Sequence, residues 1–280
     1  MRLTLPQKLA ALPARRRGGS RNSLWLLLLA LPMLLFLVLP LLALIIRIRP
    51  ITILHNLINN EVTQAITLSL TTTALSTLLA LLFGTPLAYL LARRNFRGQA
   101  LVDTLIDLPM VLPPSVAGIA LLLAFGRRGL FGTLLADWGV SLAFTQAAVV
   151  LAQVFVAAPF YVKASIAGFA GVDRDLEQAA AIDGANSWRI FRSITVPLAW
   201  PVLFGGAVMT WARALGEFGA TIIFAGNFPG RTQTMPLAIY IGFELELNVA
   251  LTLSIILLTT SFTVLFVVKE MLKQSLNTVP

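Results

Sequence analysis

The residues best suited to chemistry in this sequence are two opposite charges inside an apolar segment. Arg213 and Glu217 lie in the run from Pro201 to Ala225, where most other side chains are apolar or small. Four residues apart on a helix, the two side chains share one face and can form an ion pair. At about 1.5 Å per residue, Arg213 would lie about 18 Å from Pro201, which predicts a position near the bilayer midplane. An unpaired charge there costs at least about 2.5 kcal/mol, so intramembrane charges are functional candidates.

The residues leave three roles open for this charge pair. It could hold two helices in one conformation as a latch or gate. Arg213 could instead contact an anionic substrate directly. The pair could also take part in assembly with a second copy of the chain, because Gly216 and Gly219 would let another helix approach closely.

A second candidate site is marked by prolines. Pro109, Pro113 and Pro114 fall in the apolar run from Leu108 to Phe125, next to Ser115. Each proline removes a backbone donor and disturbs a helix. Broken backbone at membrane depth is tolerated only inside protein or beside a water-filled cavity. This run is therefore predicted either to line a pathway or to be a kinked packing helix.

A third candidate is a short polar segment that follows the charged run. It contains Arg231, Thr232, Gln233 and Thr234. Hydrogen-bond donors of this kind suit a tetrahedral oxyanion or the docking of a second protein. A solvated loop without a specific role is the alternative.

The composition shows that these residues must be positioned by membrane-spanning helices. Hydrophobic residues make up 58% of the 280 residues, charged residues only 12%, and the mean hydropathy is +0.86. Soluble domains carry about 25% charged residues, so a soluble enzyme and a disordered chain are excluded. The absence of cysteine and the single histidine exclude disulfide scaffolds and His-rich metal sites. The net charge of +9 does not indicate a nucleic-acid partner, because the basic residues lie at the ends of apolar runs.

Six apolar segments are long enough, or nearly so, to cross a bilayer, which takes about 20 residues. They are residues 24–46, 68–91, 108–125, 146–162, 201–225 and 249–268. Most of the 21 Lys and Arg residues then fall on one side, so both termini are predicted to be cytoplasmic. Residues 1–46 resemble a signal peptide, but the apolar stretch exceeds the usual core of about 7–15 residues, and we expect a retained helix.

The fold class predicted from these segments is an all-α polytopic membrane protein with about six transmembrane helices in the cell membrane. A basic cytoplasmic tail is expected at 1–22, one membrane domain at 23–268 and a cytoplasmic tail at 269–280.

The longest cytoplasmic loop, about residues 171–197, is predicted to form two short helices. Asp173 and Asp175 favour a helix start, because negative charge stabilises the positive end of the helix dipole. Gly184 can end that helix in a left-handed conformation. Ser187 can cap a second helix, which Pro197 is expected to stop before the fifth span. Alanines between Asp175 and Gly184 leave one face with little bulk, which a partner could approach closely.

This loop resembles the EAA loop of ABC-importer permeases, whose usual pattern is E-A-A-x3-G-x9-I-x-L-P. The matching residues are Gln178, Ala179, Ala180, Gly184, Ile194 and Pro197. Gln178 replaces the Glu of the pattern, although Glu177 precedes it, and Val196 replaces the Leu. The spacing is intact.

The resemblance implies a type I importer-like permease fold and a set of partners. In that family the loop forms a coupling helix that docks on a separate ATPase subunit, which assigns Glu177, Gln178, Ala179, Ala180, Asp183, Gly184 and Pro197 to coupling. Two ATPase subunits, a second permease copy in a homodimer and an external binding protein are implied, with ATP and Mg in the ATPase. The chain has no G-x4-G-K-[ST] phosphate loop, so it is expected not to be an enzyme itself.

Further segments resemble the oxyanion permeases, the molybdate and sulfate groups. They are residues 84–94, 108–118, 213–221 and 225–240, the last most like the molybdate permeases. Molybdate, and with it tungstate, is the implied cargo, and sulfate or thiosulfate is the alternative.

An intramembrane enzyme is a weaker alternative: Asp103 and Asp107 share a helical face but lie near the cytoplasmic edge. A channel or secondary transporter would not need the loop.

Overall fold

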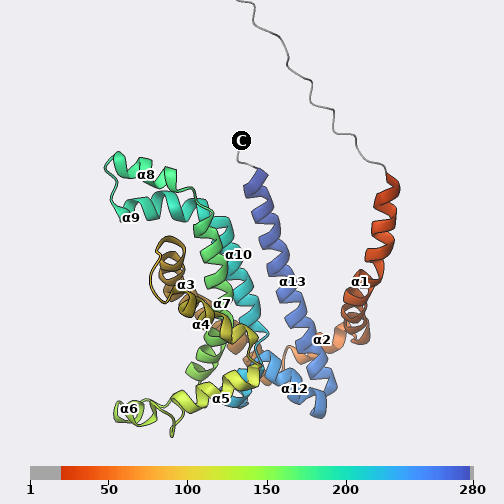
Figure 1. The fold of residues 1–280 in the computed structure, drawn as a ribbon. Coiled ribbons are helices and arrows are strands. Elements are labelled where there is room, and N and C mark those ends of the chain that lie inside the picture. The colour runs from red at the N-terminus through yellow and green to blue at the C-terminus, as the bar shows by residue number, and fades with distance from the viewer. Residues whose placement is uncertain (1–19, 278–280) are drawn as a thin grey trace, which may run out of the picture. The chain divides into compact units, whose positions relative to one another are not determined.

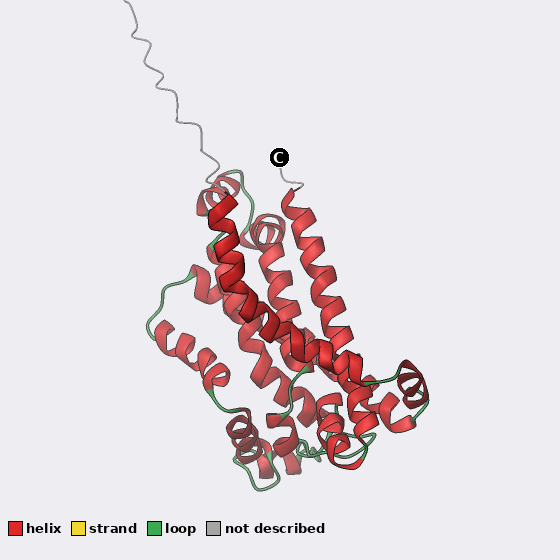
Figure 2. Ribbon diagram, turned by 90° about the vertical axis from the view of Figure 1, so that its right-hand side faces the viewer, coloured by secondary structure: helices red, strands yellow, loops and turns green. Residues whose placement is uncertain are grey.

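The computed structural model describes residues 20–277, and every regular element in that range is helical (Figures 1 and 2). In chain order the elements are α1 (Ser20–Arg47), α2 (Pro50–Asn56), α3 (Asn60–Arg93), α4 (Gln99–Val111), α5 (Pro114–Phe125), α6 (Gly132–Asp137), α7 (Gln146–Ala170), α8 (Arg174–Ile182), α9 (Ser187–Ile190), the π-helical turn η1 (Phe191–Thr195), α10 (Val196–Leu215), α11 (Gly219–Phe224), α12 (Met235–Leu245) and α13 (Leu247–Asn277). Most of the predicted basic tail at 1–22 lies outside the described residues.

The chain divides into two compact units at the bond between Arg47 and Ile48. The first unit contains α1, a continuous helix that includes Pro32 and Pro40. The segment from Trp25 to Arg47 is long and apolar enough to cross a membrane. The predicted membrane domain, 23–268, includes this boundary.

The expectation of about six spans is confirmed for the described residues. Five helices are long and apolar enough to cross a membrane, and the pair of α4 and α5 makes a sixth if counted as one span. The predicted bounds of several spans were too short. The second span, α3, begins at Asn60 rather than at 68. The fourth span, α7, continues past Val162 to Ala170, and the sixth, α13, continues past Val268 to Asn277.

The third span is not a kinked helix but two helices bent by 116°. Leu112 and Pro113, the two linking residues, are both extended, with ψ of 137° and 134°. Each of them precedes a proline, and the ring of the following proline disfavours the helical conformation. Pro109 remains inside α4. The break therefore follows from two consecutive prolines rather than from a single one.

The fifth span also differs from the prediction. It begins at Ser187 rather than Pro201, and it ends at Leu215 rather than Ala225. Pro197 does not stop the helix, because the π-helical turn η1 precedes it. A π-helical turn is wider than an α-helical turn. It therefore moves the preceding backbone carbonyls away from the ring of Pro197, which would clash with them in a regular α-helix.

The core of the second unit is built around α7, which packs against α3, α4, α5, α10 and α11. Three buried clusters are centred on Val149 and Phe224, on Leu215 and Met235, and on Val162 and Phe169. Hydroxyl and amide groups supplement this packing, as where Ser76 Oγ lies 2.9 Å from Gln153 Oε1. Figure 1 shows α8 and α9 at one end of this unit, and α5, α6 and α12 at the other.

Candidate functional site

The ion pair that the spacing predicts is present. Arg213 Nη1 lies 2.8 Å from Glu217 Oε2, and the side chains are 30% and 1% exposed. The second carboxylate oxygen, Oε1, accepts the backbone N–H of Ala220 at 2.8 Å. Glu217 thus bonds to the last turn of α10 and to the first turn of α11 at once. The Glu217 carboxylate therefore links the two helices, and the Arg213 side chain stays partly exposed.

The expected midplane position of Arg213 is not supported, because the fifth span ends at Leu215. Arg213 lies in the last turn of α10, where a cation is stabilised by the negative end of the helix dipole. The break at Gly216 was missed because the sequence stays apolar through Ala225.

The two predicted pathway segments meet at a close contact between α5 and α11. A Cβ on Gly219 would lie 2.6 Å from Pro114 Cβ, and a Cβ on Gly118 would lie 2.9 Å from Ala220 O. Gly219 therefore admits a helix of its own chain, so it is not free to admit one from a second copy. Gly216, by contrast, is exposed.

The residues at the break of the third span lie at the surface of the second unit. Pro113, Pro114 and Ser115 are all exposed, whereas Ala117 and Gly118 in the next turn are buried against α11. The structure thus brings the exposed break to the helix that Glu217 caps. Whether these residues line a pathway stays a prediction.

The polar segment after α11 is mostly interior. Thr232, Gln233 and Thr234 are buried, and Thr232 Oγ1 accepts the backbone N–H of Phe228 at 3.1 Å. The interpretation as a solvated loop is therefore wrong for these three residues. Arg231 is exposed and remains the accessible charge of the segment.

The loop after α7 is predicted to form two short helices. One of them, α8, stands apart as predicted, whereas the second, α9, continues through η1 into α10. Asp173 caps α8 by accepting the N–H of Asp175 at 3.0 Å, and Gly184 takes the left-handed conformation, with φ of 86°. The cap of α9 is Asn186, which accepts the N–H of Arg189 at 2.8 Å. The prediction of Ser187 as the cap is wrong by one residue, because Asn and Ser are about equally good caps.

Most of the residues that the sequence assigns to coupling are exposed. Gln178, Ala179, Asp183, Gly184 and Pro197 are exposed, and Ala180 is half-buried. Ile182 and Trp188 are 86% and 67% exposed. Trp188 also stacks on Phe191, with ring centroids 5.7 Å apart. Exposed apolar groups gathered in one place are typical of a protein-binding surface.

Glu177 points the opposite way, towards the bundle. Its Oε1 lies 2.9 Å from Arg93 Nη2 at the end of α3 and accepts the Thr195 hydroxyl at 2.6 Å. Sequence reasoning missed Arg93 and Thr195. A signal for Arg93 was available, since a charge at the inner edge of an apolar helix needs a partner.

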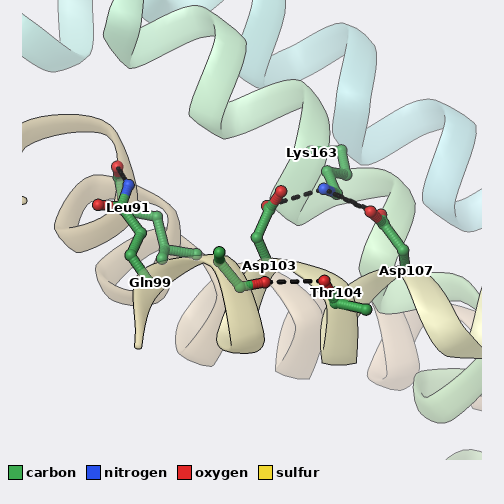
Figure 3. A network of polar contacts seen from close by, with 7 residues as sticks. Leu91, Gln99, Asp103, Thr104, Asp107 and Lys163 are labelled. Atoms are coloured by element: carbon green, nitrogen blue, oxygen red, sulfur yellow. Dashed lines mark hydrogen bonds and ion pairs between the residues drawn. The ribbon is translucent and has the colours of Figure 1, made fainter. Parts of the chain in front are cut away.

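A second polar cluster joins α4 to α7 (Figure 3). Lys163 Nζ lies 2.8 Å from Asp103 Oδ1 and 2.9 Å from the Asp107 carboxylate. The two carboxylates thus share one ammonium group, which is a structural arrangement rather than a catalytic aspartate pair. In the part of the chain that the structure describes, no group of three or more His, Asp or Glu side chains could hold a metal ion.

Comparison with known proteins gives a family match. Residues 84–276 match the family described as "Binding-protein-dependent transport system inner membrane component". The molybdenum transport system permease protein ModB of Escherichia coli K12 is 48% identical over 167 residues, which cover 58% of this chain and 73% of that protein. ModB of Mycobacterium tuberculosis is 44% identical over 183 residues, 65% and 69% of the two chains. The molybdate/tungstate permease protein WtpB of Thermococcus kodakarensis is 41% identical over 168 residues, 60% and 62% of the two chains.

Solved structures share the fold. A bacterial ABC transporter involved in the import of the acidic polysaccharide alginate aligns with a TM-score of 0.73 at 17% identity, covering 91% of this chain and 96% of that chain. The MetNI methionine ABC transporter in an inward-facing conformation aligns with a TM-score of 0.59 at 18% identity, covering 76% and 95%.

Proposed function

Because the chain belongs to the family of binding-protein-dependent transport system inner membrane components, we propose that it is the permease subunit of an ATP-binding-cassette importer for molybdate. It is a multi-pass protein of the inner membrane, and its homologues are transport permeases rather than enzymes. The observation that carries the choice of anion is its identity with permeases named for molybdenum transport. Tungstate is proposed as a second cargo, because WtpB is named for both anions.

The hairpin of α8 and α9 supports a role in coupling. It stands at one end of the second unit with exposed apolar groups, Ile182 and Trp188, and with small residues such as Ala179 that permit close approach. We propose that an ATPase subunit binds this surface, with two such subunits in the complex. ATP and Mg²⁺ would be held by the ATPase, since this sequence lacks a phosphate loop.

The pathway is proposed to lie at the break between α4 and α5. Exposed prolines, a helix end and the partly exposed side chain of Arg213 are close to α11. Such broken backbone is tolerated beside water or protein, which a second permease copy around the same pathway would supply. Alternating access follows if ATP binding and hydrolysis favour different conformations of this dimer.

An external binding protein is proposed to deliver the anion at the end of the unit opposite α8 and α9. Arg231 is an exposed charge in the polar segment that the distribution of basic residues predicts to be external. With this orientation the termini and the hairpin are cytoplasmic, as the distribution of basic residues indicates.

Two rival functions are less well supported. A sulfate or thiosulfate permease would have the same architecture, and the relatives' names favour molybdate over it. An intramembrane enzyme would need a reactive pair, and Asp103 and Asp107 are instead bound to Lys163. A channel or secondary transporter would leave the exposed hairpin without a role.

The test is uptake of labelled molybdate by cells with and without this chain, in competition with tungstate and, separately, with sulfate. Loss of uptake on deletion, with competition by tungstate and not by sulfate, is the expected result. Retained molybdate uptake with lost sulfate uptake would assign the chain to the rival permease group.

A further inference from the structure

Apolar burial does not hold the helix α8 in place. None of the residues of α8 or α9 is buried. A helix of nine residues is marginal in water without tertiary contacts. The position of α8 must therefore depend on a small number of specific polar contacts.

Those contacts converge on one carboxylate. Arg93 Nη2, at the end of α3, donates to Glu177 Oε1 at 2.9 Å and to Val172 O at 3.1 Å. Thr195 Oγ1, in the π-helical turn that leads into α10, donates to the same Glu177 oxygen at 2.6 Å. Four segments of the chain, the ends of α3 and α7, the helix α8 and the turn η1, thus meet at these residues.

The burial of this cluster makes it stiffer than a surface ion pair. The Arg93 and Glu177 side chains are 8% and 16% exposed, and Thr195 is fully buried. Charged hydrogen bonds are stronger where water is excluded, and removal of one partner leaves the other charge uncompensated. Thr195 is β-branched, which restricts its side-chain rotation and fixes the direction of its hydroxyl.

We propose that Arg93, Glu177 and Thr195 are positioning residues for transport. These three residues, called the clamp below, fix α8 to the end of α3 and to the start of the span that contains α10. A displacement of α8 would then move these spans instead of being absorbed by the loop. This inference rests on the proposed function, in which a partner ATPase moves the hairpin.

Gln178, the neighbour of Glu177, shows that the clamp differs from the exposed surface of α8 and α9 that is proposed to bind the ATPase. Gln178, which occupies the Glu position of the EAA pattern, is exposed, whereas Glu177 is turned towards Arg93. Successive residues on a helix point about 100° apart, so one can face a partner while the other faces the bundle. The hairpin also turns at Gly184, and the wide conformational freedom of a glycine backbone would let this turn absorb movement if α8 were not tied to the spans.

The first test measures the clamp itself in the full-length permease by hydrogen exchange. In Glu177→Ala and Arg93→Ala, amides of residues 176–183 are expected to exchange about tenfold faster, because local opening becomes easier. The double variant should add little to either single variant, since both remove the same contact. Arg94→Ala is the matched control, because Arg94 is the exposed neighbour of Arg93 at the end of α3. Unchanged exchange in the clamp variants would overturn the proposal.

The second test separates positioning from general stability in liposomes that hold the permease with its ATPase and binding protein. Glu177→Ala, and the milder Glu177→Gln and Thr195→Val, are expected to keep ATPase activity while molybdate taken up per ATP falls by up to about tenfold. Two results would overturn the proposal. One is a parallel fall of ATP hydrolysis and molybdate uptake, and the other is unchanged uptake per ATP in all three variants. Failure of the proposed function differs from both results, because the unmodified complex would then take up no molybdate, and the exchange test would still apply.

Discussion

Pro114 and Gly219 touch where the break of the third span meets the first turn of α11. A Cβ on Gly219 would lie 2.6 Å from Pro114 Cβ, well inside the separation of about 3.5–4.0 Å at which carbon atoms attract. The distance between α5 and α11 is therefore set by the absence of a side chain at position 219.

Replacement of this glycine should disturb both helices. Gly219→Ala is expected to destabilise the protein by about 1–3 kcal/mol through overpacking. It should also reduce molybdate uptake, because α5 carries the exposed break. Gly205→Ala is the matched control, since a Cβ there would have only Leu272 Cδ1 within reach, at 3.8 Å. Thermal unfolding in detergent and uptake in cells measure the two effects, and equal behaviour of the two variants would contradict this explanation.

Loss of the Arg213 charge should abolish uptake while the protein still inserts into the membrane. In Arg213→Ala, Glu217 is left as a carboxylate that is only 1% exposed, and such an unpaired charge costs roughly 3–5 kcal/mol. Arg213→Lys should retain part of the activity, because it keeps the charge. Uptake and the yield of membrane-inserted protein are measured side by side, and normal uptake by Arg213→Ala would exclude a role in the pathway.

Glu217→Gln distinguishes two of the roles open to the pair, the latch and a direct contact with the anion. A latch needs both partners, so this variant should lose uptake as Arg213→Ala does. A direct contact between Arg213 and the anion needs only the arginine, and Glu217→Gln would then retain uptake. Since Gln can still accept the N–H of Ala220, the cap of α11 is preserved in this comparison.

Lys163 should matter more to the attachment of α4 than either of its partners. Its ammonium group bridges Asp103 and Asp107, which are 48% and 45% exposed, so loss of one carboxylate should cost only about 0.2–1 kcal/mol. Lys163→Met leaves two negative charges on one helical face, where they repel each other. We expect a larger fall in melting temperature for Lys163→Met than for Asp103→Asn. Addition of Asp103→Asn and Asp107→Asn to Lys163→Met should restore stability, and a further fall would contradict the bridge.

The parts of the fold that could be predicted depend on local pattern. The spans follow from apolar runs, the Arg213–Glu217 pair from helical spacing, and the caps at Asp173 and Gly184 from residue type. In each case the physical cause lies within a few residues along the chain. The same holds for the break after α4, since two consecutive prolines mark it.

The parts that could not be predicted depend on contacts between distant segments. Glu177 pairs with Arg93, which is far away in the sequence. Nothing in the local pattern around Gln178 indicated that the Glu177 side chain points towards the bundle. The π-helical turn before Pro197 turned an expected helix stop into a continuous span. The burial of Thr232 and Thr234 was hidden by their polar character, because a hydroxyl can be satisfied inside the protein as well as in water.

Two buried hydroxyl groups where α3 meets the start of α12, those of Ser69 and Thr234, should respond in opposite ways to removal. Ser69 Oγ accepts the backbone N–H of Met235 at 2.7 Å, so Ser69→Ala leaves a buried donor unpaired and should cost about 1–3 kcal/mol. Thr234 Oγ1 is buried without a hydrogen-bond partner among the described residues, so Thr234→Val should be neutral or stabilising by up to about 1 kcal/mol. Thermal unfolding of the two variants checks the energies, and molybdate uptake checks the role. Stable Thr234→Val protein with lost uptake would show that this hydroxyl serves the anion after all, whereas normal uptake restricts the accessible chemistry of the segment to Arg231.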